Sequence, residues 1–109
     1  MIETDVPVVG GGQAGATAAK YLSQNSIDNI LVQRNLTYRK PCGGGIRLDA
    51  FDEFEINKDV IKKYVNSMAI VYKTQRIEVD ISQTPLGMVD RVEFDSLLRE
   101  NAQNSGSAL

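Results

Sequence analysis

The sequence predicts an α/β fold whose first 33 residues form a strand, a helix and a second strand. Residues 2–9 are rich in apolar and β-branched side chains and run into three glycines, which is typical of a buried strand before a tight turn. Residues 13–24 favour a helix, and residues 30–32 predict another short buried strand. The helix face expected to be buried carries Ala14, Ala18, Tyr21 and Leu22. Pro7 is an irregularity, because its missing N–H is expected to delete one hydrogen bond between the strands.

The middle of the sequence predicts shorter elements. Residues 34–45 have no clean periodicity and contain consecutive glycines, so they predict a loop. Two short helices at 48–54 and 58–64 are expected before two strands, 67–72 and 76–81, joined as a hairpin. Apolar and acidic side chains alternate in the second strand, so one face of it is expected to be buried. A turn is expected at Pro-Leu-Gly, shortly after the hairpin.

A final helix is expected from about Glu93, with Phe94 and Leu98 on its buried face. Ala108 and Leu109 then look like the start of a further parallel strand. We therefore expect the sequence to be a fragment of a longer polypeptide.

Composition and charge exclude several classes of protein. Hydrophobic residues make up 42% of the sequence, charged residues 24%, and the formal net charge is −2, which is the profile of a folded globular chain. Without a basic excess, a nucleic-acid partner is not expected. The sequence contains no run of 18 apolar residues, which is about the length needed to span a membrane.

Individual residue types narrow the chemistry further. The sequence has no histidine, which excludes histidine-based metal sites, catalytic triads and general bases. Cys42 is the one cysteine and cannot form an internal disulfide. The first residues lack the pattern of a secretory signal, so a cytoplasmic location is expected.

The glycines after the first strand form a G-x-G-x-x-G motif at residues 10–15. A strand before it and a helix after it are the context that dinucleotide binding requires. Gly10 is expected to make the tight turn, Gly12 to let the main chain approach a pyrophosphate, and Gly15 to let helix and strand pack closely. The helix N-terminus would offer N–H groups to the phosphates. A glycine-rich turn without a ligand is the alternative.

The end of the second strand departs from the usual dinucleotide pattern. Gln33 occupies the place of the acidic residue that binds ribose hydroxyls, and this loss of charge is expected to weaken adenosine binding by about 1 kcal/mol. In a second interpretation, Gln33 and Arg34 accommodate a 2′-phosphate and define an NADP site. Arg34 could also be a solvated loop charge.

Four segments follow one another in an informative order: DVPVVGGGQAGATAAKYL, ILVQRN, KPCGGGI and VDRVEFDSLLRENAQNSGS. Together they resemble the opening part of the geranylgeranyl reductase family, FAD-dependent oxidoreductases with the p-hydroxybenzoate hydroxylase type of fold. The resemblance implies a Rossmann-like FAD-binding βαβ unit followed by the beginning of an inserted α+β substrate domain. Residues 1–47 would hold the βαβ unit and a flavin loop, residues 48–87 would begin the substrate domain, and residues 88–109 would return to the FAD-binding domain.

The resemblance also implies roles for single residues. Ala14 would contact the FAD pyrophosphate through its main chain, and Arg91 would reach the FAD phosphates or ribose. Cys42 and the glycines beside it would lie against the flavin, with Cys42 as the candidate catalytic proton donor. The implied cofactor-binding set is Gly10, Gly12, Ala14, Gly15, Gln33, Arg34, Cys42, Gly43, Gly45 and Arg91. The alternatives are an inert Cys42, a merely flexible glycine loop and a surface ion pair of Arg91 with Asp90 or Glu93.

The activity implied by the resemblance is reduction of isoprenoid C=C bonds, with NAD(P)H as the hydride donor to FAD. The substrate would be a small molecule or a prenyl lipid, and peripheral membrane contact of the full-length parent is left open. The alternatives are an FAD-dependent aromatic monooxygenase of the same fold, an NADP-binding Rossmann dehydrogenase and an inert fragment without a cofactor.

Overall fold

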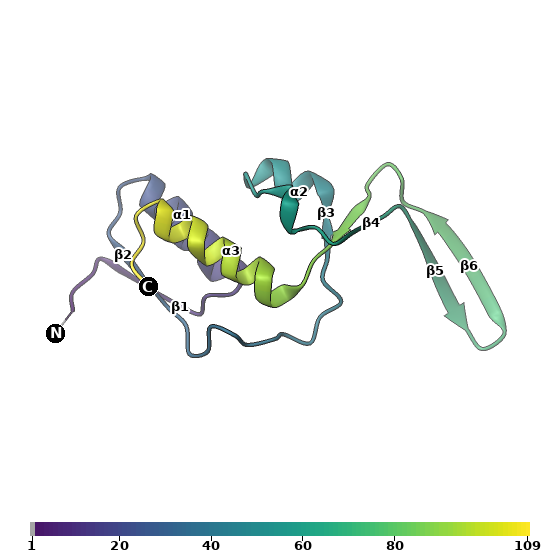
Figure 1. The fold of residues 1–109 in the computed structure, drawn as a ribbon, viewed down its shortest axis with the longest axis horizontal. Coiled ribbons are helices and arrows are strands. Elements are labelled where there is room, and N and C mark those ends of the chain that lie inside the picture. The colour runs from purple at the N-terminus through teal and green to yellow at the C-terminus, as the bar shows by residue number, and fades with distance from the viewer. Residues whose placement is uncertain (1) are drawn as a thin grey trace. The chain divides into compact units, whose positions relative to one another are not determined.

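The computed structural model describes residues 2–109, and the chain divides into two compact units (Figure 1). The first unit combines the residues up to Lys40 with the segment 91–109. The second unit is the segment 41–90. The chain therefore leaves the first unit after Lys40 and returns to it at Arg91.

The predicted βαβ arrangement is confirmed in the first unit. Strand β1 (Val6–Val9) and strand β2 (Asn29–Val32) are parallel and are connected by helix α1 (Gln13–Gln24). Ala108 forms a parallel bridge with Ile30 on β2. This isolated bridge places Ala108 beside β2 in the parallel direction that the sequence predicted.

Helix α3 (Arg91–Asn104) packs against α1 and supplies much of the core of the first unit. Phe94 and Leu98 are buried, as predicted, and so are the small side chains of Ala16 and Ala19 on α1. Alanines in this position allow two helices to approach closely, and burial of these apolar groups stabilises the unit. Helix α3 begins two residues before the predicted start at Glu93.

The predicted buried face of α1 is wrong. Ala14, Ala18 and Tyr21 are exposed, whereas Ala16 and Ala19 are fully buried. Alanine occurs on both sides of this helix, so its pattern does not distinguish the face that meets α3 from the opposite one. The buried face of α1 is set by its packing against α3. Helix α3 starts about seventy residues after the end of α1.

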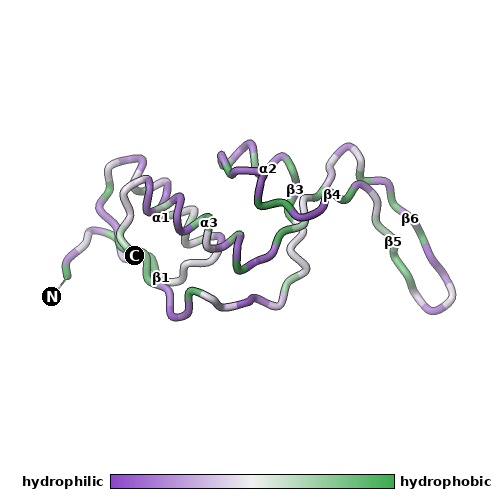
Figure 2. Tube along the Cα trace, in the orientation of Figure 1, coloured by the Kyte–Doolittle hydropathy of each residue, from purple (hydrophilic) through white to green (hydrophobic). Residues whose placement is uncertain are grey.

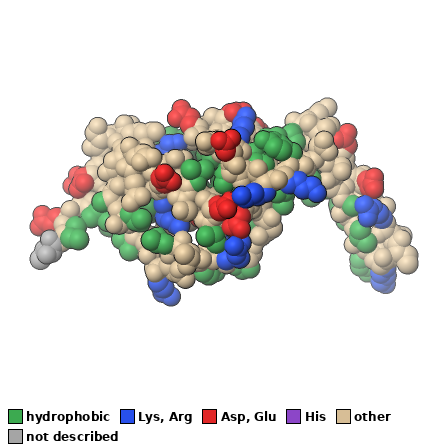
Figure 3. Space-filling model, viewed as in Figure 1, with side chains coloured by type: hydrophobic (Ala, Val, Ile, Leu, Met, Phe, Trp, Pro, Cys, Tyr) green, Lys and Arg blue, Asp and Glu red, His purple; other side chains and the backbone are tan. Residues whose placement is uncertain are grey.

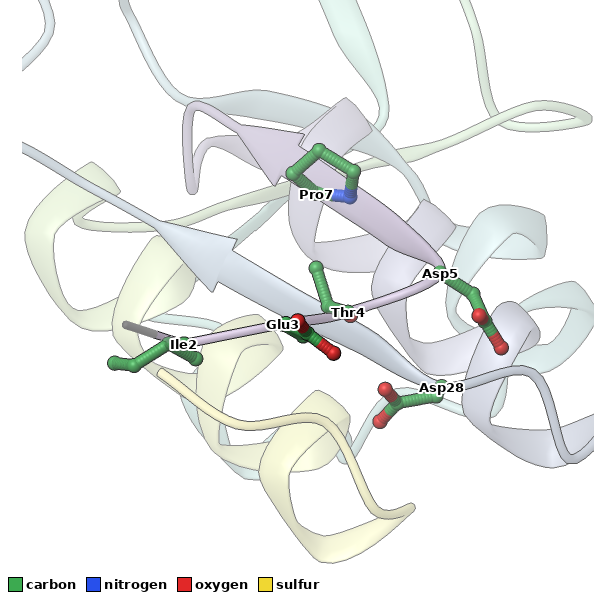
Figure 4. Close-up of a pocket in the computed structure, with 6 residues that line it drawn as sticks. All are labelled: Ile2, Glu3, Thr4, Asp5, Pro7 and Asp28. Carbon is green, nitrogen blue, oxygen red and sulfur yellow. The ribbon is translucent and has the colours of Figure 1, made fainter.

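Pro7 lies in β1 without costing a bond to β2 (Figure 4). The N–H of Val6 donates to the main-chain carbonyl of Asp28 at 3.1 Å, and the N–H of Gly10 donates to the main-chain carbonyl of Val32 at 2.7 Å. Donors that face the same neighbour alternate along a strand, so the nitrogen of Pro7 faces away from β2. The expected loss of a hydrogen bond to β2 is therefore wrong, because the imide nitrogen falls on the side that makes no such bond.

The second unit contains a small antiparallel sheet and a separate hairpin. Strands β3 (Gly45–Arg47) and β4 (Lys63–Val65) both pair with β7 (Leu86–Met88). Helix α2 (Leu48–Glu53) follows β3 and buries Phe51.

Two predictions for this unit are wrong in part. Only Lys58–Val60 is helical in the second predicted helix, as a single 3-10 turn, and the chain then extends into β4. Asn57 caps this turn by accepting a hydrogen bond from the N–H of Asp59 at 2.9 Å. The predicted turn at Pro-Leu-Gly is mostly strand, because Leu86–Met88 is the central strand of the sheet and pairs on both sides.

The predicted hairpin is confirmed as β5 (Ser67–Tyr72) and β6 (Gln75–Asp80). Both strands are exposed along their whole length, so the predicted buried face is wrong for the described residues. Met68 pairs with Val79 and Ile70 pairs with Ile77, so these apolar side chains share one face of the hairpin. Hydrophobic stretches occur along both strands of the hairpin (Figure 2). An isolated two-stranded hairpin is marginally stable in water.

Candidate functional site

The turn after β1 contains two positions that only glycine fits. Gly10 has a φ of +101°, a conformation that other residues rarely adopt. At Gly15, a Cβ atom would lie 1.7 Å from the carbonyl oxygen of Gly10, so the helix could not approach the turn. The roles that the sequence suggests for Gly10 and Gly15 in shaping the turn therefore have a direct geometric basis.

Gly12 is different, since nothing in the structure requires a glycine there. A Cβ atom at Gly12 would meet no other atom within 4 Å. Gly12 is also the N-cap of α1, and no side chain caps the helix. The first intrahelical bond runs from the N–H of Ala16 to Gly12 at 2.9 Å, which leaves the N–H groups of Gln13 and Ala14 without helical partners. Open main chain at a helix N-terminus is suited to an anion.

The turn opens into a hollow of about 500 Å³ within the first unit. Its lining contains the glycine turn together with Gln33 at the end of β2, Tyr38 and Lys40 in the following loop, and Arg91 and Asp95 on α3. The structure thus brings most of the predicted turn residues, Gln33 and Arg91 to one place. Arg34 is exposed and is not among the residues that line the hollow.

Gln33 is held by the protein at both ends of its amide. Its Oε1 accepts a hydrogen bond from the N–H of Gly11, and its Nε2 donates to the carbonyl of Asn35 at 3.0 Å. The side chain therefore links the end of β2 to the glycine turn. Its polar atoms have partners without any ribose.

Arg91 forms an ion pair with Asp95 one helical turn later. The Arg91 Nε lies 3.0 Å from Oδ1 of Asp95, and its Nη2 lies 3.2 Å from Oδ2. The two side chains are only 8% and 10% exposed, respectively. A buried, two-pronged pair of this kind fixes the guanidinium in position, and it is unlike the weak surface contact considered as an alternative.

The loop with Cys42 belongs to the second unit. Gly44 has a φ of +79°, and a Cβ atom there would lie 2.2 Å from the carbonyl oxygen of Val89. The N–H of Gly44 also donates to the Cys42 Sγ at 3.4 Å, and the thiol-bearing residue is exposed. Gly43 has open space where a Cβ would be. The loop is therefore shaped by Gly44, while Gly43 presents bare main chain.

Three charged side chains and one tyrosine at this site were not predicted as functional. Tyr38, Lys40 and Asp95 line the hollow, and Arg99 contacts the glycine turn. The spacing of Arg91 and Asp95 is the one at which opposite charges meet on a helix, so this pair could have been found in the sequence. The other three depend on the path of the loop and on helix packing, which the local sequence pattern does not specify.

Other parts of the surface offer less chemistry. Acidic and basic side chains are interspersed on the visible face, without a continuous basic patch (Figure 3). Glu3, Asp5 and Asp28 line a hollow at the start of β1 (Figure 4), yet residues 2–109 contain no cluster of acidic or cysteine side chains suited to a metal ion. No helix in this part of the chain has the length and apolarity needed to cross a membrane.

The parallel βαβ unit with its glycine turn has the Rossmann type of fold, which confirms the predicted fold class. The model of the pyridine nucleotide-disulphide oxidoreductase family matches residues 4–100, and the chain belongs to this family.

Relatives of known name support a closer similarity to geranylgeranyl reductases. The chloroplastic geranylgeranyl diphosphate reductase of Arabidopsis thaliana is 40% identical over 109 residues, which cover 95% of this chain and 23% of the relative. The enzyme of the same name from Synechocystis is 40% identical over 107 residues, which cover 94% of this chain and 26% of the relative. The predicted resemblance is thereby confirmed. The chain spans about a quarter of the length of these relatives.

Solved structures confirm the fold. A geranylgeranyl bacteriochlorophyll reductase-like protein from Thermoplasma acidophilum matches with a TM-score of 0.81 and 24% identity, over 96% of this chain and 29% of that one. The flavin-dependent brominase Bmp2 matches with a TM-score of 0.79 and 16% identity, over 96% of this chain and 28% of that one. The same fold therefore occurs in flavoproteins that catalyse different reactions.

Proposed function

We propose that this chain is the FAD-binding opening part of a flavin-dependent reductase that acts on isoprenoid C=C bonds. The observation that carries the proposal is the geometry of the glycine turn. Gly10 and Gly15 fix its shape, while Gly12 and the uncapped N-terminus of α1 leave main-chain donors open. This arrangement fits a diphosphate, because N–H groups and the helix dipole both favour negative charge.

The chain's own residues would bind and orient the cofactor. Gln13 and Ala14 would donate main-chain N–H groups to the pyrophosphate, and Arg91, fixed by Asp95, would place its guanidinium beside it. Gly43 and Gly45 would let the main chain approach a flat ring. Bound FAD would supply hydride transfer.

The reduction of a C=C bond needs a hydride at one carbon and a proton at the next. Bound FAD, reduced by NAD(P)H, would supply the hydride, and the exposed Cys42 thiol would donate the proton. The Cys42 thiolate would then take up a proton from solvent. The names of the relatives support a prenyl substrate. We also propose that the parent is cytoplasmic, with peripheral membrane contact where a prenyl lipid is the substrate.

A flavin-dependent oxygenation or halogenation is the second candidate. Solved structures with a similar fold include a flavin-dependent brominase and other halogenases. An NADP dehydrogenase is less favoured, because the amide of Gln33 is already engaged and Arg34 does not line the hollow.

Reconstitution with FAD tests the proposal. The intact protein that carries this chain should bind FAD, show flavin absorbance and, once supplied with NAD(P)H, reduce a geranylgeranyl substrate under anaerobic conditions. A flavin that is reduced but reacts only with oxygen would favour the oxygenase. Tighter binding of NADP than of FAD would favour the dehydrogenase, and binding of neither would overturn the proposal.

A further inference from the structure

Arg99 is a buried cation on α3 that bonds to main-chain carbonyls. Arg99 is only 6% exposed. Its Nη1 donates to the carbonyl of Gly11 at 2.9 Å, and its Nη2 donates to the carbonyl of Leu36 at 2.9 Å. Within residues 2–109 no carboxylate forms an ion pair with it. Since burying a charge without a counter-ion is costly, this arrangement calls for a specific role.

Gly11 is held on both sides by side chains from other elements. Its N–H donates to Gln33 Oε1, and its carbonyl accepts from Arg99 Nη1. We call Gln33, Gly11 and Arg99 the Gly11 clamp. A Cβ atom at Gly11 would lie 2.8 Å from Cδ of Arg99 and 3.2 Å from Cβ of Gln33. The clamp is therefore packed closely against Gly11, and a larger residue there would push the Arg99 and Gln33 side chains aside.

The clamp also explains why an amide suits position 33. The Gln33 Nε2 donates to the carbonyl of Asn35 at 3.0 Å while Oε1 accepts from Gly11. A carboxylate could accept from Gly11, but it has no proton to donate to Asn35. Gln33 thus joins the loop after β2 to the glycine turn, and Arg99 makes the same connection from α3 through Leu36.

We propose that Arg99 is a positioning residue for the diphosphate-binding turn, acting through the Gly11 clamp. The clamp fixes the peptide next to Gly12, so the N–H groups at the start of α1 are oriented before an anionic ligand arrives. Preorganisation of this kind reduces the ordering cost of binding. The positive charge of Arg99 close to the turn also strengthens the attraction of the turn for a diphosphate. The inference rests on the proposed FAD binding of the turn.

The test compares FAD affinity in three variants of the intact protein. Arg99→Met should weaken FAD binding roughly tenfold, because it removes both charged donors. Arg99→Lys keeps the charge and one donor, so its loss should be roughly threefold. Leu98→Ala is the matched control, since it truncates a buried side chain on the same helix without touching the turn. It should lower the unfolding temperature and leave the FAD affinity unchanged.

Hydrogen exchange at Gly11 gives a readout that does not need the cofactor. The Gly11 N–H should exchange faster in Arg99→Met than in the wild type or in Leu98→Ala, because the clamp is released. Unchanged exchange at Gly11 would overturn the clamp, even if the wild type binds no FAD and the proposed function itself fails. Wild-type FAD affinity in Arg99→Met, or an equal loss in Leu98→Ala, would also overturn it. If Arg99→Met does not fold, Arg99→Lys takes its place in both measurements, FAD affinity and hydrogen exchange at Gly11.

Discussion

The chain contains two glycine-rich segments, and they differ in how many of their glycines the fold requires. In the turn at residues 10–15, Gly10 and Gly15 are required by the fold, and Gly11 is closely packed. In the loop at residues 42–45, only Gly44 is required, through its positive φ and its contact with Val89. A Cβ atom would meet open space at Gly10 and Gly12 in the turn and at Gly43 in the loop, but Gly10 also has a positive φ. Each segment therefore has one glycine that neither its φ nor its contacts require, Gly12 in the turn and Gly43 in the loop. A glycine that the fold does not need is the one on which a ligand contact can be tested separately from stability.

The largest effect is expected for Gly15→Ala. Its Cβ would lie 1.7 Å from the carbonyl oxygen of Gly10, so α1 would have to move away from the turn. We expect the free energy of unfolding to fall by about 3 kcal/mol or more, measured by denaturant unfolding. A loss below about 1 kcal/mol would mean that the turn adapts and that close packing at Gly15 does not shape it.

Gly44→Ala should have the next largest effect. It combines a φ of +79° with a Cβ position 2.2 Å from the carbonyl oxygen of Val89. A loss of about 2–3 kcal/mol is expected, because an alanine would be strained and the Val89 main chain would have to shift. Gly45→Ala is the control in the same loop, since its nearest contacts are side chains at 3.5 Å or more. Equal losses in the two variants would show that the loop conformation, rather than position 44, is limiting.

The comparison also shows how far the sequence could be used. The glycine spacing, the two flanking strands and α1 were predictable, because the motif and the apolar runs are local. The face of α1 and the burial of Arg99 were not, because both depend on how α3 packs against residues distant in sequence. The hydrogen bond of Gln33 to Gly11 was not predictable either, because its two partners are 22 residues apart. In the second unit, β4 and β7 are three residues long, and such short strands carry too few positions for an alternating pattern to be recognised.

Gly12→Ala should separate binding from folding. The position has a φ of −77° and no atom within 4 Å of a Cβ, so alanine fits the free protein. We expect the free energy of unfolding to fall by no more than about 1 kcal/mol, which is the cost of placing alanine, a poorer N-cap than glycine, at this position. FAD affinity should fall roughly thirtyfold or more, because the Cβ would occupy the place where the pyrophosphate meets the main chain. Fluorescence titration with FAD measures this affinity. An unchanged affinity would show that the diphosphate does not bind at the turn.

Gly43→Ala should have the smallest effect on the protein and tests whether the loop meets a flavin. Open space at its Cβ position predicts a change in unfolding free energy of less than about 0.5 kcal/mol. If Gly43 presents bare main chain to the ring, the added methyl should weaken FAD binding roughly threefold, because it interrupts a close approach. It should also shift the flavin absorbance, while Gly12→Ala should weaken binding without shifting the spectrum of the flavin that remains bound. If Gly43→Ala leaves both affinity and spectrum unchanged while Gly12→Ala loses affinity, the turn binds the diphosphate and the loop does not contact the ring at Gly43. The proton-donor role of Cys42 would then lose its structural support, because it requires this loop to lie beside the flavin.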